Sequence, residues 1–193
     1  RTILVTGSQG LLGSCLVLNK NFNIIFLPST HNPKNKSTYN FDILNSAIVE
    51  SFLYKHQPDV IINCAAFTNV DLGYKHKKEC HDINVNGLKN LLKYSSINTK
   101  IVHISTDYVF DGSSSIYDES SITRPLNYYG KTKLEAENIL IGSNKDYLIF
   151  RPNVLYNNKG ENFFTFVYNS KINKKKINVV IDQFSNPAYV PFF

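Results

Sequence analysis

The chain of 193 residues has no apolar run that approaches the length needed to cross a bilayer. The opening segment, residues 1–7, is short and leads directly into a glycine turn, so it does not resemble a signal peptide. Apolar residues make up 42% of the sequence and charged residues 19%, a composition typical of globular chains and not of disordered ones. We therefore expect a globular protein that does not enter a membrane.

Metal-site and disulfide patterns are also missing. Cys15, Cys64 and Cys80 are widely separated, and the five histidines do not cluster. An odd number of scattered cysteines argues against a disulfide framework, and their spacing fits no metal site. We expect reduced thiols in a cytoplasmic protein, and no metal ion.

The net charge of +6 does not by itself identify a partner. The lysines are scattered or stand in short runs, at residues 75–78 and 174–176, which are typical of solvated helix ends. Basic chains can bind nucleic acid, but an anionic small substrate accounts for the charge equally well. With no further nucleic-acid signal, we expect a small substrate and no nucleic acid.

Short apolar runs alternate with longer amphipathic stretches along the whole chain, without repeats or linkers. The runs predict strands at residues 2–6, 23–27, 60–64, 100–105, 147–151 and 177–181, with Pro28 closing the second. The stretches predict helices at residues 11–20, 44–56, 82–94, 128–141 and 160–170. Residues 31–40 and the long segment 107–127 are expected to be loops. The alternation predicts an α/β fold, a Rossmann-type doubly wound parallel sheet.

A glycine motif follows the first predicted strand and opens the first predicted helix. The first glycine allows a tight turn, the second lets the backbone approach a pyrophosphate, and the third lets helix and strand pack closely. The helix N-terminus then presents unpaired amides to phosphates, so we favour a dinucleotide site over a purely structural turn. The candidate cofactor-binding residues of this segment are Gly7, Gln9, Gly10, Leu11, Leu12 and Gly13.

The G-x-x-G-x-x-G spacing resembles that of extended short-chain dehydrogenases/reductases. A carboxylate that would bind the ribose 2′-hydroxyl is expected at the end of the second strand. Residues 28–31 offer none, and Lys34 and Lys36 follow. This absence removes a repulsion against a 2′-phosphate, so we predict NADP(H), or a site that accepts both NADP(H) and NAD(H). A plain surface loop is the alternative interpretation.

Two further segments are candidates for cofactor binding. Asp42 and Ile43 precede the second helix, where an Asp often contacts the adenine amine in families of this type. An ordinary N-cap role for Asp42 is the alternative. Small residues end the third strand and either leave room for a ligand or pack against a helix. They are Cys64, Ala65, Ala66 and Thr68.

Tyr129 and Lys133 lie four residues apart on a predicted helix and therefore share a face. A free tyrosine has a pKa of about 10 and is a poor acid–base catalyst at neutral pH. A neighbouring ammonium lowers that pKa. With Thr106 at the end of the preceding strand, Tyr129 could hold a carbonyl oxygen, as a general acid beside a hydrogen-bond donor. On spacing alone, an exposed Tyr–Lys pair remains the alternative.

These motifs together resemble the dTDP-4-dehydrorhamnose reductase family over essentially the whole chain. They are the glycine segment, residues 65–71, the Ser-Thr-Asp-Tyr-Val-Phe-Asp-Gly segment at 105–112, the segment at 125–133 that contains Tyr-Gly-Lys-Thr-Lys, and Asp182-Gln183. The resemblance implies NAD(P)H-dependent reduction of the C4 ketone of a nucleotide-linked 6-deoxy sugar. It implies a catalytic set of Thr106, Tyr129 and Lys133, and a homodimer is a further expectation.

The resemblance also implies further site residues and a domain plan. Tyr129 and Lys133 would contact the cofactor as well. The residues expected at the substrate are Thr106, Asp107, Tyr108, Val109, Phe110 and Val154. Residues 1–193 would form the NAD(P)-binding domain, with the start of a substrate-binding region at about 152–193. Family members run about a hundred residues longer, a domain-scale length.

Three alternatives accompany this interpretation. Sugar 4,6-dehydratases usually carry Asp-Glu after the Thr, whereas Tyr108 follows Asp107 here, which disfavours dehydration. Val154 stands where rhamnose reductases often have Trp, so the identity of the sugar stays open. A related nucleotide-sugar epimerase or reductase is therefore an alternative. The beta subunit of methionine adenosyltransferase resembles the same reductases and keeps the Tyr-x-x-x-Lys motif, yet acts as a regulatory partner.

Overall fold

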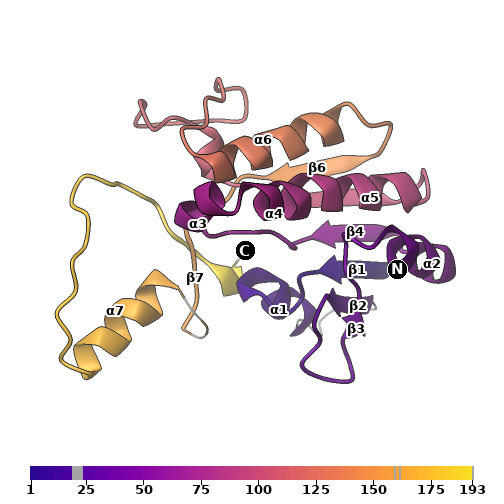
Figure 1. Cartoon of the computed structure of the whole chain (residues 1–193), viewed down its shortest axis with the longest axis horizontal. Helices are drawn as coiled ribbons and strands as arrows, with labels where there is room; N and C mark the ends of the chain where they lie inside the picture. Colours follow the sequence, from indigo (N-terminus) through magenta and orange to yellow (C-terminus); the bar gives the residue numbers. More distant parts are fainter. Residues whose placement is uncertain (19–23, 159, 161, 193) are drawn as a thin grey trace.

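A six-stranded parallel sheet forms the centre of the computed structural model, which describes residues 1–18, 24–158, 160 and 162–192 (Figure 1). Its strands follow the order β3-β2-β1-β4-β5-β6. They are β1 Thr2–Thr6, β2 Ile25–Thr30, β3 Tyr39–Asn40, β4 Val60–Asn63, β5 Lys100–Ile104 and β6 Tyr147–Phe150. This is the strand order of Rossmann folds, so the predicted fold class is confirmed.

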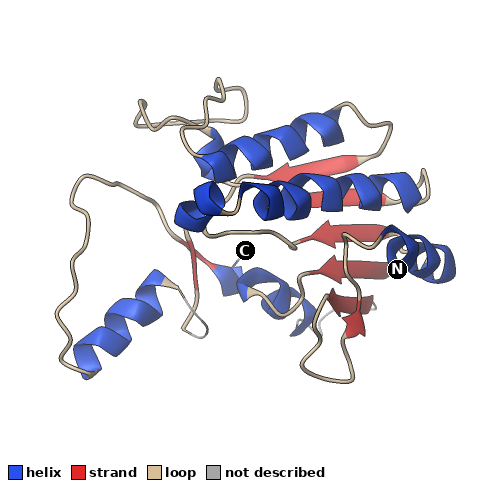
Figure 2. Ribbon diagram, viewed as in Figure 1, coloured by secondary structure: helices blue, strands red, loops and turns tan. Residues whose placement is uncertain are grey.

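Helices cover both faces of this sheet (Figure 2). The helical segments are α1 Leu11–Leu18, α2 Ser46–His56, α3 Val70–Lys75, α4 Lys77–His81, the π turn η1 Asp82–Asn86, α5 Gly87–Tyr94, the 3₁₀ turn η2 Asp107–Val109, α6 Tyr128–Ile141, α7 Phe163–Ile172 and the 3₁₀ turn η3 Val190–Phe192. Helix α5 contacts α2 and α6, so these three helices form one layer. The crossovers through α1 and α2 run in opposite directions along the sheet, so right-handed connections place these two helices on opposite faces.

The core centres on a row of apolar side chains that crosses the middle of the sheet. Leu4, Ile61 and Ile101 are register partners on β1, β4 and β5, and all three are fully buried. Leu88 and Leu91 of α5 belong to the same apolar cluster. Each such side chain stabilises the fold by roughly 1.5–3 kcal/mol. The row holds the three strands in register and so fixes where their carboxyl ends lie.

Two strand predictions were wrong. Pro28 does not close the second strand, because it pairs with Val5 within β2. β3 pairs only with Ser29 and Thr30, so at Pro28 the outer side of β2 has no partner strand among the described residues. Proline is tolerated at such an edge. Residues 177–181 form no strand, and Val179, Val180 and Ile181 are more than half exposed. In the described part of the chain no strand pairs with that apolar run. The structure instead pairs β7 Leu155–Tyr156 with β8 Ala188–Tyr189.

The other elements agree with the prediction more closely. The strand at 2–6 and the helix at 128–141 are confirmed to the residue. The helix predicted at 82–94 begins as a π turn and follows two short helices that the sequence did not reveal. Residues 19–20, 23 and 161, at the ends of three predicted elements, lie outside the described residues. Within the described ranges, no helix is both long and apolar enough to span a membrane.

Gly13→Ala is predicted to lower the free energy of unfolding. A Cβ at Gly13 would lie 2.5 Å from the Gly7 carbonyl oxygen and 2.9 Å from the Ser8 Cα, and this backbone cannot move aside cheaply. Overpacking of this kind costs about 1–3 kcal/mol. Urea unfolding of the intact protein measures the loss.

The matched control is Gly73→Ala in α3. Its Cβ would meet nothing closer than the Cys80 Sγ at 3.7 Å, an ordinary contact. Alanine also favours a helix over glycine, so this variant is expected to be neutral or slightly stabilised. Equal losses in the two variants would contradict the close approach assigned to Gly13.

Candidate active site

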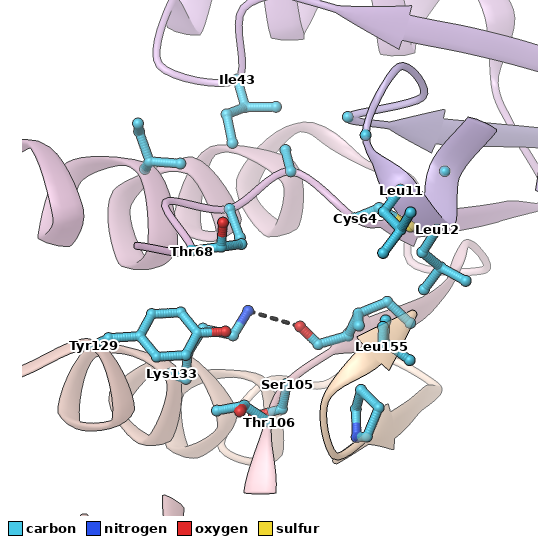
Figure 3. A pocket seen from close by; sticks show the side chains of 18 of the residues that line it. Leu11, Leu12, Ile43, Cys64, Thr68, Ser105, Thr106, Tyr129, Lys133 and Leu155 are labelled. Carbon is cyan, nitrogen blue, oxygen red and sulfur yellow. Dashed lines mark hydrogen bonds between the residues drawn. The ribbon is translucent and has the colours of Figure 1, made fainter. Parts of the chain in front are cut away.

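A cavity of about 810 Å³ opens where the parallel strands end. Its wall is formed by the segments that follow each of the six strands and by one face of α6 (Figure 3). Parallel strands bring their carboxyl ends to one edge of the sheet, so residues far apart in the sequence meet there. This edge is the place where open α/β sheets bind ligands.

Most of the predicted site residues line this cavity. They are Gly7, Gly10, Leu11, Leu12, Gly13, Asp42, Ile43, Cys64, Ala65, Ala66, Thr68, Thr106, Asp107, Tyr108, Tyr129, Lys133 and Val154. Gln9, Val109 and Phe110 are not among the residues that line it. Val109 is fully buried in the protein, and the Phe110 ring stacks on Tyr117 with centroids 4.5 Å apart. The Val109 and Phe110 side chains therefore pack within the protein.

The glycine segment forms the turn between β1 and α1. Gly7 has a φ of +60°, which favours glycine, and its carbonyl accepts a hydrogen bond from the Gly10 amide at 2.9 Å. Helix α1 then begins at Leu11, so its first amides lie at the cavity wall. The first amides of a helix have no partner within the helix, which gives this end of the cavity affinity for anions.

Asp42 does not cap a helix. Its Oδ1 accepts a hydrogen bond from the Leu44 amide at 2.9 Å, and α2 begins later, at Ser46. Asn45 is the N-cap residue, because its side chain accepts the Ile48 amide. The N-cap alternative for Asp42 was therefore wrong, and its half-buried side chain lies at the cavity.

The cavity is also lined by Thr30, the last residue of β2, and by His31, which follows it. No carboxylate occurs between residues 28 and 38. Lys34 and Lys36 are exposed in the loop that follows. The end of β2 and the loop that follows it therefore present no carboxylate to an anionic group.

Tyr129 and Lys133 lie side by side on the buried face of α6 (Figure 3). Tyr129 is 8% exposed and Lys133 is 1% exposed. The Lys133 Nζ donates a 2.6 Å hydrogen bond to the Ile104 carbonyl at the end of β5. The neighbouring Tyr128 instead packs near Tyr74, and the Lys77 ammonium lies 5.6 Å from its ring centroid. The helix therefore turns Tyr129, and not Tyr128, toward the cavity.

Burial raises the pKa of Tyr129 to about 12, although a hydrogen bond with the Thr106 side chain lowers it in part. The expectation that Lys133 brings this pKa below its usual value was wrong for this structure. Desolvation of a phenolate outweighs the favourable interactions because the ring is almost fully enclosed. At neutral pH Tyr129 is therefore a neutral phenol that carries a proton.

Lys133 is a buried cation. Burial lowers the pKa of its ammonium to about 8, and the Glu137 carboxylate is the largest influence that raises it. With that pKa the side chain is mostly charged at neutral pH. The cavity wall thus presents a proton donor and a positive charge one helical turn apart.

Thr106 joins this pair from the end of β5. Its Oγ1 accepts the Tyr108 amide and donates to the Asp107 Oδ1, both at 3.2 Å, so the hydroxyl caps η2. Burial raises the pKa of the Asp107 carboxyl, and the Thr106 hydroxyl partly opposes this. Together, Thr106 and Tyr129 place two hydroxyl groups where a carbonyl oxygen could accept from both.

Asn84 contributes to the site and was missed by the sequence analysis. Its Oδ1 accepts the Phe67 amide at 2.8 Å, and its Nδ2 donates to the Thr132 Oγ1 at 2.9 Å. It thereby ties the loop after β4 to α6. The π turn Asp82–Asn86 places this buried polar residue inward, within the segment that the amphipathic pattern predicted as a regular helix at 82–94. A regular 3.6-residue period gives no signal for such a turn.

Comparison with known proteins identifies relatives across the whole chain. Residues 1–192 match the family model described as the RmlD substrate binding domain. The chain is 34% identical over 193 residues to a dTDP-4-dehydrorhamnose reductase of Aggregatibacter actinomycetemcomitans, covering 97% of this chain and 63% of the relative. It is 35% identical over 161 residues to the methionine adenosyltransferase 2 subunit beta of Bos taurus, covering 81% and 47%.

A solved structure is similar as well. The dTDP-4-dehydrorhamnose reductase of Bacillus anthracis, in complex with NADP, superposes with a TM-score of 0.87 at 32% identity. The alignment covers 98% of this chain and 66% of that one. The chain thus spans between about half and two thirds of the length of these relatives.

Thr106→Val is predicted to lower the free energy of unfolding by about 1 kcal/mol, the typical net contribution of one hydrogen bond. Valine keeps the shape but leaves the Tyr108 amide without its acceptor. Thr106→Ser keeps the hydroxyl and is expected to retain most of the stability. Urea unfolding compares the two. A valine variant as stable as the wild type would show that this hydrogen bond does not stabilise the fold.

Proposed function

The chain belongs to the RmlD substrate binding domain family, and from that premise we propose that it is the NAD(P)-binding part of a nucleotide-sugar reductase. The reaction is reduction of the C4 ketone of a nucleotide-linked 4-keto-6-deoxy sugar. One observation carries the proposal: Thr106, Tyr129 and Lys133 meet in the wall of a cavity that also contains the glycine turn.

The residues at the cavity fit a dinucleotide. The glycine turn and the first amides of α1 would hold the pyrophosphate, and Asp42 would meet the adenine. Ser105 supports this fit, because its Oγ is buried at the cavity without a hydrogen-bond partner in the described part of the chain. The absence of a carboxylate after β2 favours NADP(H), while use of NAD(H) stays open. When bound, the nicotinamide supplies the hydride.

The chain's own residues supply the rest of the chemistry. As the C4 carbon gains the hydride, its oxygen becomes an alkoxide that needs a proton. Tyr129 donates that proton, which converts the alkoxide to an alcohol and leaves a phenolate. The Lys133 ammonium stabilises the phenolate and holds the nicotinamide ribose. The Thr106 hydroxyl, which donates to the Asp107 Oδ1 in this structure, would turn to donate its hydrogen bond to the same sugar oxygen.

A regulatory role is the second candidate. It is favoured by the 35% identity to the bovine methionine adenosyltransferase beta subunit, which is similar to the 34% identity to the reductase. A regulatory subunit would bind a protein partner tightly and turn over no keto-sugar. The two functions are therefore separated by assay of the intact protein.

Gly10→Ala is predicted to weaken NADP(H) binding at least about tenfold, since a methyl group would occupy the space where the pyrophosphate meets the backbone. Within the protein its Cβ would meet only the Gly7 carbonyl oxygen, at 3.2 Å, so the fold is expected to survive. Calorimetry with NADPH measures the affinity, and Gly73→Ala serves as the control. Unchanged binding by Gly10→Ala would rule out this position for the pyrophosphate.

Tyr129→Phe is predicted to lower kcat by about 10²–10⁴-fold, the usual contribution of general acid catalysis, with NADPH binding nearly intact. Tyr128→Phe is the matched control and should have a much smaller effect, because Tyr128 packs against Tyr74 and Lys77. NADPH oxidation by the intact protein is measured with a panel of nucleotide-linked 4-keto-6-deoxy sugars.

Two outcomes of this assay would contradict the proposal. If Tyr128→Phe lost more activity than Tyr129→Phe, the proton donor would be misassigned. If the intact wild-type protein turned over none of the sugars but bound a protein partner tightly, the regulatory function would replace the enzymatic one.

A further inference from the structure

A buried carboxylate lies one helical turn beyond Lys133 on α6. Glu137 is fully buried, and residues four apart on a helix are neighbours on the same face. Its oxygens accept three hydrogen bonds from Arg151, from Nε at 3.1 and 3.2 Å and from Nη2 at 2.7 Å. Burying a charged pair carries a desolvation cost, which hydrophobic residues of the same volume would avoid. Stability alone therefore does not explain the pair.

Arg151 is fixed from its other side. Its guanidinium carbon lies 5.2 Å from the centroid of the Phe110 ring, and that ring stacks on Tyr117. Arg151 follows directly after β6, so its backbone is anchored by the sheet. The guanidinium is thus held between the Phe110 ring and α6. Because Arg151 is fixed, the Glu137 carboxylate that it binds has little freedom to turn away.

The other titratable groups near Lys133 are neutral at neutral pH. They are Cys64 after β4, Cys80 on α4, His103 on β5 and Tyr129 on α6. Burial raises the pKa of Cys64 to about 12, raises that of Cys80, and raises that of Tyr129 to about 12. Burial also lowers the pKa of His103 well below its usual value. The Asp107 carboxyl also lines the cavity, but among the groups that raise the pKa of Lys133 the Glu137 carboxylate has the largest effect.

We propose that Glu137 is a positioning residue whose carboxylate, locked by Arg151, keeps the buried Lys133 side chain charged at the cavity wall. The inference rests on the proposed function, in which that ammonium holds the nicotinamide ribose and stabilises the Tyr129 phenolate. Glu137 does not line the cavity and acts through Lys133. Without the carboxylate, burial would release the Lys133 proton, and an uncharged amine would replace the ammonium.

The test compares Glu137→Gln with Glu135→Gln, the same substitution two residues earlier on α6. The Glu135 side chain is 46% exposed and contacts His81 at 3.2 Å, so it is remote from this network. NMR of isotope-labelled lysine follows the titration of Lys133 directly, and NADPH fluorescence follows binding against pH. In the wild type, NADPH binding should weaken as pH rises through about 8, the pKa of Lys133.

In Glu137→Gln, both titrations should move to lower pH by about one unit, because an opposite charge has been removed. Glu135→Gln should leave both unchanged. Glu137→Gln also leaves Arg151 without its carboxylate partner, which destabilises the fold. The double variant Glu137→Gln/Arg151→Met removes both charges and avoids this penalty. It should show an acidward shift that is smaller than in Glu137→Gln, because the guanidinium that repels the Lys133 ammonium is also removed.

A Lys133 titration at the wild-type pH in both Glu137 variants would overturn the inference and leave the pair a structural role. If the Lys133 titration shifted in these variants but the NADPH titration stayed at the wild-type pH, the claim that the Lys133 charge serves the cofactor would be overturned. A wild-type protein that bound no NADPH would refute the proposed function instead, and the lysine titration would still decide whether Glu137 sets the charge of Lys133.

Discussion

The hydrogen bond from the Lys133 ammonium to the Ile104 carbonyl joins α6 to the carboxyl end of β5. An ammonium this deeply buried is unfavourable unless its donors are satisfied, so the bond fixes the side chain at the floor of the cavity. Tyr129 and Glu137 lie one turn to either side of Lys133 and share its face of the helix. The orientation of α6 therefore determines both the proton donor at the cavity and the carboxylate behind it.

The sheet supplies the matching half of the site. Its central apolar row sets the register of β1, β4 and β5, so that the glycine turn, the small residues after β4 and Thr106 arrive at one edge. Polar contacts then connect these loops to the helical layer, as Asn84 does between Phe67 and Thr132. The hydroxyl pair itself is carried by the end of β5 and by α6, which the Lys133 hydrogen bond joins, and this connection favours preorganisation for one oxygen.

Several groups here combine burial with charge or polarity. Lys133, Glu137, His103 and Asp107 all have most of their surface removed from water, and burial shifts the pKa of Lys133, His103 and Asp107 toward the neutral form. Perturbed groups of this kind gather at functional sites more often than elsewhere, because catalysis needs protonation states that water alone does not provide. The pairing of Glu137 with Arg151 belongs to the same pattern, although it lies behind the cavity wall.

Much of the fold and part of the site followed from the sequence alone. The alternation of apolar runs and amphipathic stretches determined the parallel α/β fold, and the glycine spacing and the four-residue step from Tyr129 to Lys133 located the candidate residues. These signals are local, because they depend on the period of one helix or the turn after one strand. They failed at Pro28 and at residues 177–181, where the outcome depends on whether a partner strand lies alongside.

Only the tertiary structure decided the electrostatic state of the site. The raised pKa of Tyr129, the hydrogen bond of Lys133 to β5 and the burial of Glu137 against Arg151 depend on desolvation and on partners distant in sequence. The π turn that brings Asn84 inward likewise interrupts the regular helical period. The sequence by itself determined which residues are candidates for chemistry. Packing decided which are charged, because the free energy of a charge depends on the solvent and partners that the fold leaves around it.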